Sequence, residues 1–368
     1  MSTKGSSRLA GLLLVISLVL AACAAPTAVP TAAPTEQAPP ATQAQIPAET
    51  SVAQPPTRLR AAFVMTEGLE NDWDLMFYQS FQRVQAAAPH GLEIDDLAYT
   101  TGGYGADMVR VMREYAATGE YDIVYTDSGY VEQMDALRTD FPDVMFVQAG
   151  YPIGNTGGNV FFILKYINEA TYLMGYLAGS LTNTNMVGAV APFPYEDVSS
   201  DLNGFFDGAR AANPDVQIRV SFTQSWYDPP KSLEAARAQI AAGVDQIFMR
   251  AEGWEACEQE NVTCYGAYVD NTPYAPNTNL ANAFGYWDPE ISWTIDQWWS
   301  HATTGEPYDA PTDPMFFGMA EGGSALGPVN PGMTVPQDVI DAVMQVQQDI
   351  RDGRLVLHPN PEPPSSDE

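Results

Sequence analysis

Short apolar runs alternate with amphipathic stretches in the first half of the region from residue 58 to residue 357. Apolar runs of strand length lie at residues 59–65, 92–99, 122–126, 144–148 and 160–164. Stretches with helical spacing of apolar positions lie at residues 74–88, 106–118 and 131–139. Strands that alternate with helices predict a parallel sheet covered by helices on both faces.

The same alternation restarts in the second half. Strand-like runs lie at residues 186–191, 216–222 and 246–249, and another strand ends at residues 267–270. Helical spacing recurs at residues 170–180, 202–212 and 233–242. Two consecutive α/β halves predict two Rossmann-like lobes with a central cleft. Because ligands bind beyond the carboxyl ends of parallel strands, we expect the site in that cleft.

The lobe boundaries follow from these runs. We expect lobe 1 at residues 58–165 and lobe 2 at residues 166–275. The elements of residues 276–357 are too few for a core of their own, so we expect this segment to cross over and complete lobe 1. Segments 271–283 and 317–331 are rich in Asn, Gly and Pro, as hinges often are. Residues 358–368 carry Pro, Ser and acids and are predicted to be disordered.

The N-terminus has the features of an export signal. Basic residues precede an apolar run at residues 9–20, which is too short to span a bilayer. The following Leu20-Ala21-Ala22-Cys23 has the pattern of a bacterial lipobox, in which the chain is cut before a lipidated cysteine. We therefore predict a lipoprotein signal peptide at residues 1–22 and a lipid anchor at Cys23, on the extracytoplasmic face of the cell membrane. An ordinary signal peptide with a chance cysteine is the alternative.

Composition narrows the possible partners. Residues 23–57 are mostly Ala, Pro, Thr and Gln, so they predict a disordered linker behind the lipidated cysteine. The net charge of −30 disfavours nucleic acid as a partner. In an exported chain, Cys257 and Cys264 most simply form a disulfide. A two-cysteine metal site is the alternative, but no histidine lies nearby, and we expect no metal.

Motifs for catalysis are missing from the sequence. It contains no G-x-S-x-G elbow, no P-loop, no H-E-x-x-H and no G-x-G-x-x-G after a strand. The sequence therefore predicts a protein that is not an enzyme and needs no cofactor.

Aromatic residues follow several predicted strands. Trp73, Tyr130 and Trp226 all stand at positions expected to face the cleft. Two flat rings from opposite lobes can sandwich a planar ligand, whose edge Asp74 or Tyr130 can bind. Glu252 is a further candidate, because it ends a second-lobe strand. The alternatives are that Asp72 or Asp74 only caps a helix and that the tryptophans pack between the lobes without a ligand.

Several motifs resemble one family over nearly the whole body. They are VGAVAPFP at residues 187–194, NGFFDGAR at 203–210, NPDV at 213–216, SWYDP at 225–229 and AGVD at 242–245. In this order they resemble the basic membrane protein (PnrA-like) family of ABC-transporter substrate-binding lipoproteins, which includes purine-nucleoside receptors. The resemblance implies a type I periplasmic-binding-protein fold whose lobes close on a ligand.

The resemblance also implies ligand contacts. Trp73 matches the stacking aromatic, Asp74 stands where relatives have Asn, and Asp270 matches an acid that contacts ligand. Nucleoside-binding members use a late lysine, whereas this chain has none after Lys231, which favours a free base or similar heterocycle.

The implied function is that of a solute-binding lipoprotein for an ABC importer. We expect a monomer that captures a small planar heterocycle, a purine base or nucleoside, and passes it to an ABC permease. The alternatives are a ligand sensor for a membrane signalling receptor and a cell-surface nucleoside-processing enzyme.

Overall fold

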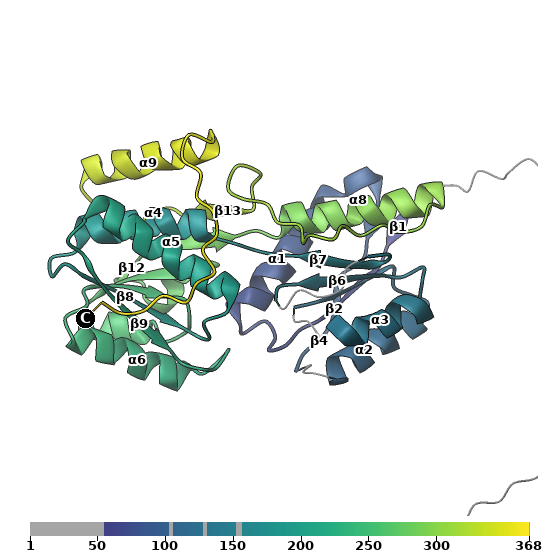
Figure 1. Ribbon diagram of the computed structural model, residues 1–368, viewed down its shortest axis with the longest axis horizontal. Helices are drawn as coiled ribbons and strands as arrows, with labels where there is room; N and C mark the ends of the chain where they lie inside the picture. The colour runs from purple at the N-terminus through teal and green to yellow at the C-terminus, as the bar shows by residue number, and fades with distance from the viewer. Residues whose placement is uncertain (1–54, 103–105, 128–130, 152–156, 368) are drawn as a thin grey trace, which may run out of the picture. The chain divides into compact units, whose positions relative to one another are not determined.

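Two α/β lobes make up the described part of the chain. The computed structural model describes residues 55–102, 106–127, 131–151 and 157–367. Each lobe is built on a parallel sheet with helices on both of its faces, as the alternating pattern predicts (Figure 1).

The first lobe is centred on a five-stranded sheet in the order β4-β2-β5-β6-β7, with all pairs parallel. Along its strands, alternate side chains face opposite layers: Phe63 and Tyr125 pack towards α1 and α8, whereas Val64 and Val124 pack towards α2 and α3. The elements of this lobe are β1 (Arg58–Leu59), β2 (Ala61–Val64), α1 (Asp72–Ala87), η1 (Pro89–Gly91), β3 (Glu93–Ile94), β4 (Ala98–Thr100), α2 (Ala106–Ala117), β5 (Ile123–Thr126), α3 (Val131–Asp140), β6 (Met145–Ala149), β7 (Val160–Ile163) and α8 (Asp288–Thr304).

The second lobe has a six-stranded sheet in the order β13-β12-β11-β10-β8-β9, parallel except for the edge pair β12–β13. Its elements are α4 (Asn168–Leu181), β8 (Met186–Ala191), α5 (Glu196–Ala212), β9 (Gln217–Phe222), α6 (Pro229–Ala241), β10 (Gln246–Met249), α7 (Glu255–Glu260), β11 (Thr263–Tyr268), η2 (Thr272–Tyr274), β12 (Asn279–Gly285), β13 (Ser324–Leu326) and α9 (Gln337–Arg351).

Glycines let α4 and α5 pack closely on this sheet. A Cβ atom at Gly175 would lie 1.8 Å from the carbonyl oxygen of Phe205, and one at Gly208 would lie 1.9 Å from that of Tyr172. Side chains at these positions would force the helices apart. The glycines of α4 and α5 therefore allow the two helices to pack closely.

The C-terminal part of the chain differs from the expectation. Only α8 and the following segment return to lobe 1, where α8 packs beside α1 (Figure 1). Met315 of that segment forms a parallel bridge with Ile163 of β7. Strands β12 and β13 instead extend the second sheet, and α9 packs on α4. The reason is that β11 leaves an open parallel edge, which β12 fills despite its Asn- and Ala-rich sequence.

The C-terminal tail also differs. We expected residues 358–368 to be disordered, but residues 358–367 lie against the second lobe. The Asp367 amide donates to the Ile218 carbonyl oxygen of β9 (3.0 Å), and the Val220 amide donates to Ser366 Oγ (3.1 Å). Asn203 of α5 donates to the Asn360 carbonyl oxygen (2.9 Å). These bonds satisfy the outer edge of β9, which would otherwise be open to pairing with another chain.

The chain crosses between the lobes three times, after β7, before α8 and before β13, and a buried ion pair joins the three crossing segments. Lys165, in the first crossing segment, donates to Glu290, which lies near the start of α8 just after the second, and both side chains are fully buried. The Phe317 amide in the third crossover also donates to Glu290 Oε1, at 3.1 Å. Lys165 Nζ lies 5.3 Å from the ring centroid of Trp287. Three separate chain segments are thus held at one point of the hinge.

The disulfide predicted from the sequence is present. Cys257 and Cys264 are paired as a disulfide whose Cα atoms lie 6.1 Å apart, linking α7 to β11. None of the helices in the described ranges is both long and apolar enough to cross a membrane.

Candidate functional site

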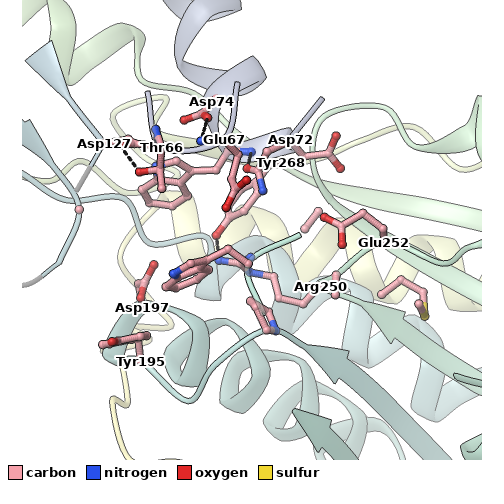
Figure 2. Close-up of a pocket in the computed structure, with 18 of the residues that line it drawn as sticks. Thr66, Glu67, Asp72, Asp74, Asp127, Tyr195, Asp197, Arg250, Glu252 and Tyr268 are labelled. Atoms are coloured by element: carbon pink, nitrogen blue, oxygen red, sulfur yellow. Dashed lines mark hydrogen bonds between the residues drawn. The ribbon is translucent and has the colours of Figure 1, made fainter. Parts of the chain in front are cut away.

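A cavity of about 330 Å³ lies at the carboxyl ends of strands from both sheets. This volume is within the range of small-molecule sites. Figure 2 shows side chains from both lobes directed towards it. Its lining includes the following polar and aromatic residues from both lobes: Thr66, Asn71, Asp72, Trp73, Asp74, Asp127, Tyr195, Asp197, Trp226, Arg250, Glu252, Trp254 and Tyr268.

The first helix brings Trp73 to the first-lobe wall. Asn71 is the helix N-cap, and its side chain accepts from the Trp73 amide at 2.9 Å. The indole of Trp73 packs edge-to-face against Trp287 and Tyr268, with both centroid distances at 5.3 Å. Because Trp287 is fully buried, it fixes the position of Trp73 from behind.

The opposite wall carries an aromatic group from the loops after β8 and β9. Trp226 is half-buried and stacks on Tyr195, with centroids 5.4 Å apart and planes 16° apart. Phe193 contacts the same indole at 5.1 Å. Trp226 is therefore held by aromatic neighbours, as Trp73 is on the first lobe.

Direct contacts also join the two lobes beside the cavity. Asn271, which follows β11, donates to Asp72 Oδ2 at 2.7 Å. Tyr268, the last residue of β11, contacts Trp73. Its backbone has a φ of 69°, a left-handed conformation that is uncommon for a side-chain-bearing residue and is found preferentially at functional sites.

Buried carboxyl groups dominate the polar part of the lining. Burial raises the pKa of Asp72 to about 6, although its bond from Asn271 opposes the shift. Burial raises the pKa of Glu252 to about 7. Asp127 accepts from the amide of Thr66 (2.7 Å) and from its hydroxyl (2.5 Å). Burial raises the pKa of Asp127 and, together with the charge of Asp127, that of Asp74.

The second lobe contributes one cationic side chain, Arg250, to the same lining. Arg250 Nε donates to Asp201 Oδ2 at 2.9 Å, and both side chains are almost fully buried. Burial raises the pKa of Asp201 to about 7, and the nearby charge of Arg250 opposes that shift. Asp197, one turn earlier on α5, lines the cavity and also has a raised pKa because it is buried.

Comparison with known proteins identifies the family. Residues 63–262 match the family described as ABC transporter substrate-binding protein PnrA-like. The chain belongs to this family.

Individual relatives agree with that assignment. A purine-binding protein of Brucella abortus is 25% identical over 81% of this chain and 82% of its own length. A Haloferax volcanii protein, provisionally named an ABC transporter glucose-binding protein, is 31% identical over 57% of this chain and 56% of its own length. A solved solute-binding protein from Conexibacter woesei has the same fold, with a TM-score of 0.63, 22% identity, and coverage of 82% of this chain and 99% of its own.

As a PnrA-like protein, the chain is a substrate-binding component of an ABC transporter, of a kind that works outside the cytoplasm with a permease. The family consists of solute-binding proteins rather than enzymes. Within the described ranges, no group of three or more His, Cys, Asp or Glu side chains is arranged to hold a metal ion.

Four of the predicted site residues of this PnrA-like protein lie at the cavity. Trp73, Asp74, Trp226 and Glu252 all line the cavity. Asp74 has a structural role as well, because its Oδ2 accepts from the Gly68 amide at 2.7 Å. The helix cap itself is neither Asp72 nor Asp74.

One predicted residue, Asp270, is not brought to the site. Asp270 is exposed and outside the lining, and its Oδ1 instead accepts from the Thr272 amide (3.0 Å) and from Asn282 (3.3 Å). The turn at Tyr268 puts the Tyr268 side chain at the cavity instead. Tyr130 lies outside the described residues.

Several lining residues were not predicted from the sequence. Arg250 directly follows β10, and Glu252 was predicted because it lies near the end of the same strand. The expectation that strand ends face the cleft therefore applied to Arg250 as well. Tyr195 and Asp197 follow β8 and could have been found by the same rule. The pairing of Arg250 with Asp201 joins residues 49 positions apart and left no local signal.

The buried carboxyl groups make stability depend on pH. The pKa values of Asp201 and Glu252 in the folded protein are about 7, whereas unfolded carboxyl groups titrate at about 4. The folded state therefore binds more protons between these values, and its extra stability is lost as pH rises through the folded pKa. We expect the free energy of unfolding to increase by on the order of 2 kcal/mol from about pH 7.5 to about pH 5.5.

Denaturant titrations at several pH values measure this effect. Glu252→Gln should reduce the pH dependence, whereas Glu255→Gln, at an exposed position on α7, should not. A stability that is constant or falls towards pH 5.5 would contradict the raised pKa values.

Proposed function

We propose that this protein is a lipid-anchored receptor that captures a purine base or nucleoside between Trp73 and Trp226 and delivers it to an ABC permease. One observation carries the proposal: the lining includes Trp73 from the first lobe and Trp226 from the second, and each of these two indoles is held by further aromatic rings. Stacking between two aromatic faces suits a flat heterocycle, and aromatic stacking tolerates any base.

The charge of the lining limits the ligand further. Arg250 is the only cation among the described lining residues, and it is already paired with Asp201. The surrounding acids disfavour a phosphorylated ligand, because like charges repel strongly at buried sites. The oxygens of these carboxyl groups can also accept from the N–H donors of a neutral base.

Ligand capture is coupled to the hinge. A ligand that touches both tryptophans has more contacts when the lobes approach than when they separate, so it shifts the equilibrium towards the closed form. The permease then meets a loaded, closed receptor.

The anchor is proposed from the N-terminal sequence. Lipidation at Cys23 would keep the receptor at the extracytoplasmic face of the membrane, where its permease lies. In the producing cells, Cys23→Ser should move the protein from the membrane fraction to the soluble fraction. An unchanged distribution would refute lipidation at Cys23.

A thermal-shift panel on the full chain tests the proposed ligand class. We expect adenine, hypoxanthine or their nucleosides to raise the melting temperature, since saturation at 100 times Kd adds about 2.7 kcal/mol of stability. Glucose and the corresponding nucleoside monophosphates serve as comparison ligands and should give no shift. Stabilisation by glucose with none by any purine would refute the proposal.

A further inference from the structure

Two neighbours brace one edge of the Arg250 guanidinium. Its Nε donates to Asp201 Oδ2 (2.9 Å), and its Nη2 donates to the hydroxyl of Tyr268 (Figure 2 shows Arg250 beside Tyr268). The Arg250 Cζ atom lies 4.2 Å from the centroid of the Tyr268 ring. Tyr268 in turn donates to Asp201 Oδ2 at 3.2 Å. The plane of the guanidinium is therefore fixed by its neighbours.

Asp201 acts here as a positioning residue. It is fully buried on α5 and also accepts from the Ile167 amide at 3.2 Å, so its own position is fixed. It does not line the cavity, whereas Arg250 does. Its effect on a ligand would therefore pass through Arg250.

The outer end of the guanidinium faces no acceptor among the residues that the structure describes. Nη1 and the second N–H of Nη2 make no hydrogen bond within the described part of the chain, although the Arg250 side chain is only 7% exposed. Because Arg250 lines the cavity, a ligand that supplies acceptors could pair with these N–H groups. The two parallel N–H groups of the guanidinium fit two adjacent acceptor atoms.

We propose that Arg250 reads two adjacent acceptors on the ligand and so makes the cavity select 6-oxopurines over 6-aminopurines. This inference rests on the proposed binding of purines. A 6-oxopurine carries its O6 and N7 acceptors side by side, and arginine binds this pair of atoms bidentately. Adenine has an N6 donor in place of O6, which would meet a guanidinium N–H donor to donor.

The acids of the lining support a neutral oxopurine over an anion. A carboxylate ligand would also fit the guanidinium fork, but Asp72, Asp197 and Glu252 line the same cavity and would repel it. The same carboxyl groups can accept from the N–H groups on the far edge of an oxopurine.

Competitive titration of the full chain with hypoxanthine, adenine and 7-deazahypoxanthine tests the inference. We expect hypoxanthine to bind about tenfold or more tightly than adenine, as one bidentate contact discriminates between bases. We also expect 7-deazahypoxanthine, which lacks the N7 acceptor, to bind more weakly than hypoxanthine. Arg250→Gln should reverse the preference, because a glutamine amide matches the N6 and N7 atoms of adenine.

Arg237→Gln is the matched control, since it makes the same change at an exposed position of the same lobe. It should leave the preference unchanged. Equal or tighter binding of adenine by the unmodified protein would overturn the inference, as would an unchanged preference in folded Arg250→Gln. If Arg250→Gln does not fold, equal binding of hypoxanthine and 7-deazahypoxanthine by the unmodified protein overturns it. Failure of every purine to bind would refute the proposed function and the inference with it, whereas the other outcomes leave purine binding intact.

Discussion

Lys165→Met should destabilise the protein by about 3–5 kcal/mol, because it leaves the buried carboxyl of Glu290 without its cation. Burial lowers the pKa of Lys165 and raises that of Glu290, so each group depends on the other to remain charged. A buried charge that loses its partner costs far more than an exposed one. Denaturant unfolding at neutral pH measures the loss.

Two further variants separate the ion pair from other effects. Lys165→Met with Glu290→Gln should recover most of the stability, since the uncharged amide still accepts from the Phe317 amide. Lys231→Met is the matched control, because the Lys231–Asp228 pair lies at the surface and its loss should change little. Similar stability losses in the single and double variants would contradict the account of the hinge.

Trp73→Ala and Trp226→Ala should each weaken purine binding by about 10- to 100-fold. Stacking of a base on an aromatic side chain contributes about 1–3 kcal/mol, and each variant removes one face of the proposed stack. Since Trp73 also packs on Trp287 and Tyr268, Trp73→Ala should lower stability as well. Trp73→Phe should retain much of the binding, because it keeps an aromatic face.

Calorimetric titration of each folded variant measures these losses. Trp299→Ala is the control, since Trp299 stacks on His90 of the first lobe and lies outside the cavity lining. Unchanged affinity in both Trp73→Ala and Trp226→Ala would mean that these tryptophans only pack between the lobes.

Much of the fold could be predicted because its strands are locally encoded. The continuous apolar runs of β2 and β10 are fully buried, as parallel strands covered on both faces must be. Strand β12 was missed for the opposite reason. Its sequence is rich in Asn and Ala and has little strand propensity, and the strand is held by tertiary pairing with β11 and β13.

The tail was missed for a related reason. Its Pro, Ser and acidic residues give no local signal for order, and its contacts are to β9, far earlier in the chain. The composition of the tail indicates only what this segment forms alone. It does not show that the outer edge of β9 is open for the tail to pair with.

The candidate site divides in the same way. Trp73 and Trp226 were predicted because the carboxyl ends of parallel strands face the cleft, a rule that depends only on topology. Asp270 was expected from the family resemblance, which does not show how the turn after β11 directs each side chain, and Tyr268 lines the cavity instead. The topological rule also cannot pair Arg250 with Asp201, since that requires the packing of α5 against β10.

The central claim is that a purine lies between Trp73 and Trp226. Calorimetric titration of the full chain and of the Trp73→Ala/Trp226→Ala double variant, with hypoxanthine and adenine in separate experiments, tests it most directly. The account predicts saturable binding of one purine per chain by the unmodified protein, and no measurable binding by a double variant that still unfolds cooperatively. Binding of either purine by the double variant with unchanged affinity would contradict the claim.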